Sequence, residues 1–136
     1  MKRAVGCRIA TAAQAAAEVG AELPKEQKEE RVYVLPLDAG GKMLAKPILV
    51  SVGHQDGTTA IDAGAVFREA LKAGAEEIIV AHNHPSGNLK PSKADIAATA
   101  ELRDLAKRLD VPLIDHIILG ADGEFLSLAE DAAVGS

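Results

Sequence analysis

Residues 81–95 read AHNHPSGNLKPSKAD, and they directly follow an apolar run, Ile-Ile-Val, at 78–80. The apolar run predicts a buried strand. Proline, serine, glycine and asparagine at 85–88 predict a tight turn behind it. A helix pattern opens at Ser92, with Asp95 one turn inside it. The local sequence therefore brings two imidazoles at a strand end close to a carboxylate at a helix start.

This arrangement predicts a metal site. Alternate residues of an extended segment point the same way, so the rings of His82 and His84 can face one point. Asp95 can fold back toward them from the first helical turn. Two neutral imidazoles and one carboxylate suit zinc and leave a fourth position for water, as in catalytic zinc sites. Zinc lowers the pKa of such a water to about 7, which supplies hydroxide at neutral pH.

A plainer interpretation of the same residues remains open. Ser92 and Asp95 also fit a capping box, in which a serine caps the helix and an acid three residues later bonds back to it. His82 and His84 could equally be turn residues that bond backbone groups. Two histidines within three residues, in a chain with four, favour the metal site.

The combination His82-Asn83-His84-Pro85 with Ser92 and Asp95 resembles the JAMM metalloprotease motif. The longer run HNHPSGNLKPSKADI resembles the RadC branch of the JAB/MPN superfamily, as do LIDHII at 113–118 and VSVG at 50–53. The resemblance covers about residues 29–128. It implies a zinc-dependent hydrolase on an α/β fold, with a mixed β-sheet flanked by helices in a cytidine-deaminase-like architecture.

The resemblance also implies a glutamate base just before the first core strand. Aligning VLPLD with the family pattern puts this base at Glu30, with Glu29 and Glu26 as competitors. Without the resemblance, residues 25–31 (KEQKEER) read as a solvated connector. In JAMM enzymes the serine that matches Ser92 helps to hold the water or the oxyanion, a role compatible with helix capping.

The remaining reactive side chains carry weaker predictions. His116 lies in the middle of an apolar strand pattern, which favours a core histidine, although its match to the family leaves a role beside the metal ligands open. His54 lies in a polar loop, and we expect it to be exposed. Cys7 has no second cysteine to pair with and is expected to be a bystander. Ser86 lacks the nucleophile-elbow pattern of serine hydrolases.

We expect one domain over residues 1–136, with a helical lead at 1–28, a core at 29–128 and a frayed tail at 129–136. The helix-hairpin-helix module that commonly precedes this domain in the family is expected to be absent. Periodicity and turn signals predict helices at 9–21, 62–73 and 92–109, and strands at 32–38, 43–52, 77–81, 113–119 and 124–128.

Particular residues sharpen these elements. Thr11 and Asp62 are predicted helix caps, and Gly74 a helix end. Pro36 predicts an edge strand or a bulge, and Pro47 a second irregularity. The apolar faces of the second and third helices are predicted to comprise Val66, Phe67, Ala70 and Leu71, and Ala98, Leu102, Leu105 and Leu109.

Composition narrows the function classes. The 136 residues are 48% apolar, and the net charge of −5 argues against a nonspecific nucleic-acid surface. A zinc nucleobase deaminase needs a Pro-Cys-x-x-Cys pair that one cysteine cannot supply. No apolar run approaches the roughly 20 residues of a membrane span, and the start lacks a signal-peptide pattern, so we expect a cytoplasmic protein.

We therefore predict a zinc peptidase or isopeptidase that acts on a peptide or isopeptide substrate. The resemblance suggests a ubiquitin-like conjugate as the substrate class. A RadC-type module associated with DNA repair and an inactive metal-binding domain are the alternatives.

Overall fold

Five strands form one mixed sheet in the order β2-β1-β3-β4-β5. The computed structural model describes residues 6–53 and 61–130. The elements in chain order are α1 (Ala12–Gly20), β1 (Glu30–Leu37), β2 (Ile48–Gly53), α2 (Ala63–Lys72), β3 (Glu77–Asn83), α3 (Lys93–Leu109), β4 (Leu113–Leu119) and β5 (Phe125–Ser127). β3 and β4 run parallel, and the other neighbouring pairs are antiparallel. The predicted order of helices and strands and the α/β class are confirmed.

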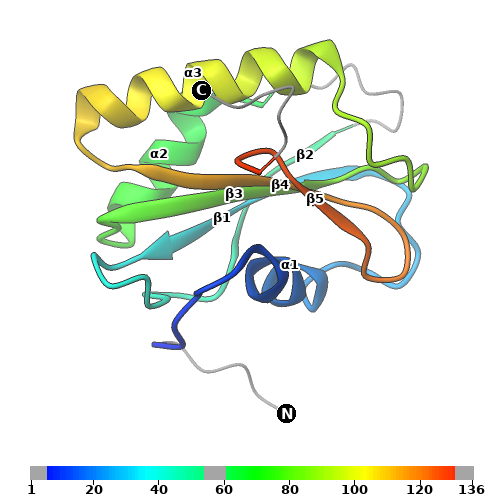
Figure 1. Ribbon diagram of the computed structural model, residues 1–136, viewed down its shortest axis with the longest axis horizontal. Coiled ribbons are helices and arrows are strands. Elements are labelled where there is room, and N and C mark those ends of the chain that lie inside the picture. Colours follow the sequence, from blue (N-terminus) through cyan, green and yellow to red (C-terminus); the bar gives the residue numbers. More distant parts are fainter. Residues whose placement is uncertain (1–5, 54–60, 131–136) are drawn as a thin grey trace.

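Helices cover both faces of the sheet, with α2 and α3 on one side and α1 on the other (Figure 1). Alternate residues of the central strands enter two separate cores, because successive side chains of a strand point to opposite faces. Val34 and Val80 pack beneath α2 and α3. Leu35 and Ala81 pack beneath α1. The central strands are therefore apolar on both faces, as the run at 78–80 predicts.

Pro36 lies in an interior strand, so the prediction of an edge strand is wrong for β1 as a whole. The N and the carbonyl of one strand residue point to the same side. The carbonyl of Pro36 accepts a hydrogen bond from the amide of Leu44, beyond the last β1–β2 partners, Val34 and Ile48. The missing N–H of proline therefore faces a position where β2 has not yet begun. The pairing of β1 with β2 does contain a register shift, but it lies between Val32 and Tyr33 and not at Pro36.

Several element boundaries and two side chains differ from the predictions. α1 begins at Ala12 and not at 9, and β1 begins at Glu30 and not at 32. β2 begins at Ile48 and not at 43; Met43 makes only an isolated bridge to Leu37. β3 continues past 81 to Asn83, because its neighbour β4 pairs with it up to that residue. Leu71 and Leu109 are 47% and 40% exposed, and so do not belong to the buried helix faces.

The helix ends follow the predicted caps. The side chains of Thr11 and Asp62 accept hydrogen bonds from Gln14 N and Ala65 N, and Thr11 forms a full capping box. Gly74 follows α2 with φ +80°, a conformation that favours glycine. His54, which was predicted to be exposed, lies outside the described residues, as does most of the predicted frayed tail. Residues 129 and 130 of that tail are still tied to the fold, since Asp115 accepts from Ala129 N and Ser127 from Glu130 N.

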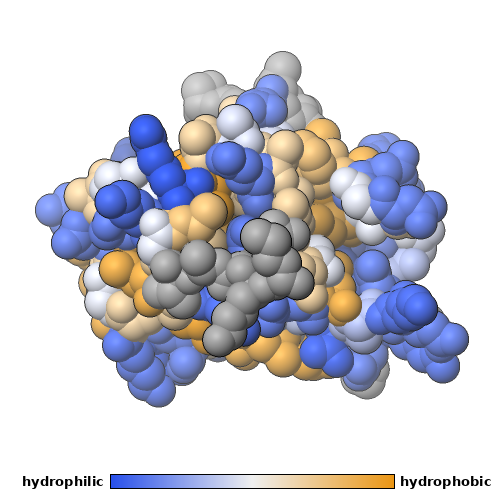
Figure 2. Space-filling model, turned by 90° about the horizontal axis from the view of Figure 1, so that it is seen from below, coloured by the Kyte–Doolittle hydropathy of each residue, from blue (hydrophilic) through white to orange (hydrophobic). Residues whose placement is uncertain are grey.

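The surface seen from the α1 side is mixed in character, with hydrophobic areas interrupted by hydrophilic ones (Figure 2). Among residues 6–53 and 61–130, no helix combines the length and the apolar character needed to cross a bilayer.

Candidate metal centre

The start of β1, the end of β3 and the start of α3 meet on the α3 side of the sheet. β1 and β3 are antiparallel with Val32 opposite His82, so the start of β1 lies beside the end of β3. The turn after β3 leads directly into the first turn of α3. These ends bring Glu30, His82, His84 and Asp95 together from positions up to 65 residues apart.

The atoms at the centre of this cluster are close enough to share one ion. Nε2 of His82 and Nε2 of His84 are 3.1 Å apart. Each also lies 3.1 Å from an oxygen of Asp95, His82 from Oδ1 and His84 from Oδ2. Tetrahedral ligands at zinc distances are separated by about 3.3 Å. The spacing therefore fits a small tetrahedral metal ion.

The hydrogen-bond partners of His84 also favour a bound cation. Its Nδ1 lies 2.7 Å from the carbonyl oxygen of Asn88, which can only accept, so Nδ1 carries the hydrogen. A neutral His84 then directs the bare lone pair of Nε2 at the carboxylate of Asp95. Two acceptors face each other there, and a proton or a metal ion between them removes the conflict.

The acid–base properties of the cluster reflect this preference for positive charge. Burial alone favours the protonated carboxyl of Asp95, but its close contacts with His82 and His84 outweigh burial and hold the pKa of Asp95 far below its usual range. The hydrogen bond to Asp95 raises the pKa of His84 above 6.5, against the opposing effect of burial. Asp95 is therefore ionised, and a cation between its carboxylate and the two imidazoles would be stabilised.

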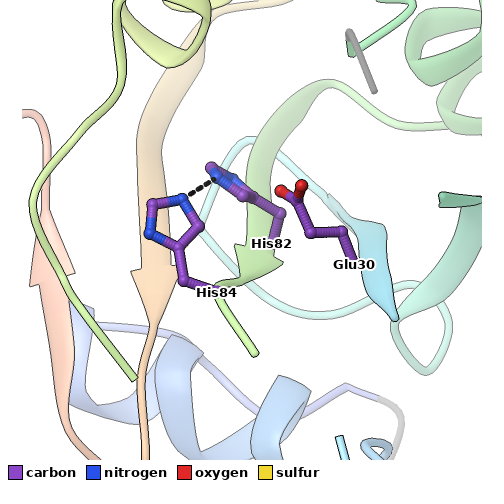
Figure 3. A group of neighbouring side chains, drawn as sticks. All are labelled: Glu30, His82 and His84. Atoms are coloured by element: carbon purple, nitrogen blue, oxygen red, sulfur yellow. Dashed lines mark hydrogen bonds between the residues drawn. The ribbon is translucent and has the colours of Figure 1, made fainter. Parts of the chain in front are cut away.

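Glu30 belongs to the same cluster, and its carboxylate points toward His82 from the neighbouring strand (Figure 3). Glu30, His82 and His84 each offer a potential ligand atom, and these atoms lie within 4.8 Å of one another. This group of residues could hold a metal ion.

Pairing with the core decides which glutamate faces the cluster. Glu30 lies two residues before Val32 and therefore points to the same face of β1. Val32 packs beneath α2 and α3 and is paired with His82, so Glu30 and His82 share that face. It is 8% exposed. Glu29 and Glu26 are exposed, and Glu26 pairs with Lys28 at 3.4 Å. The solvated-connector interpretation holds for these two residues but not for Glu30.

Asn83 fixes the backbone on both sides of Glu30. Its side-chain oxygen accepts from Arg31 N at 2.7 Å, and its side-chain nitrogen donates to the carbonyl of Glu29 at 3.1 Å. The same nitrogen also lies 3.1 Å from Oε1 of Gln27. The regular β1–β3 pairing ends at His82, so the amide of Asn83 continues it by one step. In the sequence Asn83 looks like a spacer between the histidines, and only its position at a strand end reveals this contact.

Ser92 and Asp95 do form the predicted capping box. The Ser92 hydroxyl accepts from Asp95 N at 3.0 Å, and Asp95 Oδ2 accepts from Ser92 N at 2.9 Å. The same oxygen approaches His84. The helix cap and the candidate ligand are therefore one carboxylate in two simultaneous contacts, and not alternatives.

His116 is a fully buried histidine, 1% exposed, as its strand position predicts. It also touches the cluster, because its Nε2 lies 2.9 Å from Nδ1 of His82. Its Nδ1 lies 2.7 Å from the hydroxyl of Thr99. Burial lowers the pKa of His116 to about 3, so the ring is neutral. Thr99 was not among the predicted site residues, although its place one turn after Asp95 on the buried face of α3 was a usable signal.

A polar cavity of about 220 Å³ opens beside His84. It is lined by Lys25, Gln27, His84, Pro85 and residues 120–122. The side chain of His84 is 16% exposed, against 1% for His82, so the cluster is reached from the His84 side. Cys7 is exposed and takes no part in the site.

The sheet, its helices and the cluster at the strand ends define an α/β domain of the JAB/MPN type whose residues could hold a metal ion. Residues 9–133 match the model of the RadC-like JAB domain, and the chain belongs to this family.

Similar chains are cyanobacterial UPF0758 proteins. The protein from Cyanothece sp. (strain PCC 7425) is 44% identical over 118 residues, which cover 87% of this chain and 47% of that protein. The protein from Thermosynechococcus vestitus is 40% identical over 122 residues, which cover 90% of this chain and 47% of its own length. The chain thus spans about half the length of these curated relatives. Their names state no activity.

Proposed function

We propose that this domain is a zinc-dependent peptidase or isopeptidase with His82, His84 and Asp95 as metal ligands. The observation that carries the proposal is the triangle of 3.1 Å contacts among two imidazole nitrogens and a carboxylate. Nitrogen and oxygen donors at this spacing suit zinc. When bound, zinc supplies a water of pKa near 7 and polarises a carbonyl oxygen.

In this proposal the residues around the metal divide the remaining chemistry. Glu30 accepts a proton from the attacking water and passes it to the leaving amine. Its burial beside His82, and the hydrogen bonds of Asn83 to the residues on either side of it, support a fixed position for the carboxylate. The Ser92 hydroxyl stabilises the oxyanion. The substrate contains a peptide or isopeptide bond, and a ubiquitin-like conjugate is the class we propose to test first.

The test separates the base from the ligands. Glu30→Gln keeps the size of the side chain but cannot accept a proton, so the variant should retain about one zinc per chain. Turnover of a cleavable conjugate should fall by about 10²–10⁴-fold, the usual contribution of a general base. His84→Ala should lose zinc and activity together, because it removes a ligand.

Glu29→Gln is the matched control, since Glu29 is the exposed residue directly before β1. It should change neither zinc content nor turnover. Loss of zinc in Glu30→Gln would make Glu30 a ligand in place of a base. Normal turnover in Glu30→Gln would remove it from the mechanism, and a chain that takes up no zinc on titration would overturn the whole proposal.

A further inference from the structure

A chain of hydrogen bonds runs behind the candidate metal ligands and closes into a ring. It starts at the backbone carbonyl of Asp95, passes through the Thr99 hydroxyl and the His116 ring, and ends at Nδ1 of His82. The three contacts measure 2.9, 2.7 and 2.9 Å. Asp95 Oδ1 and His82 Nε2, 3.1 Å apart, complete the ring. It connects α3, β4 and β3.

The direction of each hydrogen bond in this chain is determined. A hydroxyl has one hydrogen, and that of Thr99 goes to the Asp95 carbonyl, which can only accept. Thr99 must therefore accept from Nδ1–H of His116. The His116 ring is 1% exposed, and burial disfavours its charged form. Its Nε2 is therefore bare and must accept from Nδ1–H of His82.

These hydrogen bonds determine the state of Nε2 of His82, the atom that faces the candidate metal position. With its hydrogen on Nδ1, a neutral His82 presents the lone pair of Nε2 to His84 and Asp95. His84 reaches the same state through the carbonyl of Asn88. Thr99, His116 and His82 are 2%, 1% and 1% exposed, so water does not replace these bonds.

We propose that Thr99 and His116 are positioning residues that fix the Nε2-ligating tautomer of His82 and thereby set the metal affinity of the centre. Neither residue touches the ion. Thr99 acts only through His116, and His116 acts through His82. The inference rests on the proposed metal site but not on peptidase activity.

Zinc affinity tests this inference, measured by competition with a chromophoric chelator at one fixed pH. Thr99→Val keeps the shape of the side chain but loses its donor and acceptor, and should weaken zinc binding by about 10–100-fold, as loss of a partner behind a ligand commonly does. Thr99→Ser keeps the hydroxyl and should restore the affinity. His116→Phe should weaken binding over the same range.

The double variant tests the order of the chain. If Thr99 acts only through His116, then Thr99→Val should add nothing to the effect of His116→Phe. Additive losses, or affinities equal to that of the unsubstituted chain, would overturn the inference. Circular dichroism on each variant separates a lost fold from the loss of a positioning contact.

A spectrum of the unsubstituted, zinc-loaded chain provides a test that needs no variant. Long-range nitrogen–proton correlation identifies which nitrogen of each imidazole carries the hydrogen. We expect it on Nδ1 of both His82 and His116; a hydrogen on Nε2 of His116 would overturn the inference. If the unsubstituted chain binds no zinc, the proposed function fails, whereas zinc binding that Thr99 and His116 do not affect removes only the positioning role.

Discussion

Asp95 combines two contacts that usually belong to different residues. Its Oδ2 closes the capping box of α3 and also lies 3.1 Å from Nε2 of His84. The N-terminus of a helix favours negative charge, because its free N–H groups and its dipole point toward the carboxylate. The cap therefore helps to keep Asp95 ionised and correctly oriented in a buried position, which a metal ligand needs.

The capping role and the proposed catalytic role of Ser92 can be distinguished with a control residue elsewhere in the chain. Thr11 forms the same kind of capping box on α1, on the far face of the sheet. Ser92→Ala and Thr11→Ala should each cost about 1 kcal/mol of unfolding free energy, measured by urea denaturation.

Only Ser92→Ala should also reduce kcat, by about 10²–10³-fold if its hydroxyl stabilises an oxyanion. Zinc content should be unchanged in both variants. Equal turnover in the two would leave Ser92 with a capping role alone.

The candidate centre depends on where β1, β3 and α3 end. The last two residues of β3 shape the centre: the side chain of His82 points toward α3, and that of Asn83 points toward the start of β1. Glu30 enters from β1 through pairing across the sheet. No single element contains the centre, and the packing of α3 onto the sheet holds the parts in place.

The packing of α3 can be tested with two leucines of the same helix. Leu102 is fully buried in the core beneath α2 and α3, whereas Leu109 is 40% exposed. Leu102→Ala should cost about 2–5 kcal/mol of unfolding free energy because it leaves a cavity. Leu109→Ala should stay within about 0.5 kcal/mol, as surface substitutions usually do.

Urea denaturation of both variants provides the comparison. Equal losses would mean that Leu109 is buried in solution, as its helical spacing suggested, and would contradict the arrangement of α3 described above.

Taken as a whole, the chain is acidic, with a net charge of −5 and aromatic residues at only 2%. Nucleic acids are bound through clustered basic residues and stacked aromatic rings. We therefore expect this chain to bind duplex and single-stranded DNA only weakly at physiological salt.

Fluorescence anisotropy with labelled oligonucleotides over a range of salt concentrations checks this expectation. Tight binding with a steep dependence on salt would favour the alternative of a DNA-associated module. Such a result would not by itself bear on the metal site, which the zinc content of the chain tests separately.

Much of the local structure could be predicted because its causes are local. The apolar runs of β1 and β3 and the capping signals at Thr11, Asp62 and Ser92 each specify an element through their own chemistry. The spacing of His82 and His84 on one strand and of Asp95 on the next helix likewise follows from periodicity. Helix faces were less certain at their ends, where Leu71 and Leu109 reach solvent.

The sequence by itself thus determined the α/β class, the order of the elements and the candidate ligand trio, because each depends on contacts between near neighbours in the chain. Only the tertiary structure decided that Glu30, and not Glu29, faces the cluster. Alternation along a strand places neighbouring side chains on opposite faces, but it does not say which face packs beneath α3. The tertiary structure alone placed Thr99 and His116 behind His82 and turned Asn83 toward Glu30. Those contacts join residues 17, 34 and more than 50 positions apart, and only the pairing of strands in the folded sheet and the packing of α3 onto it bring them within hydrogen-bonding distance.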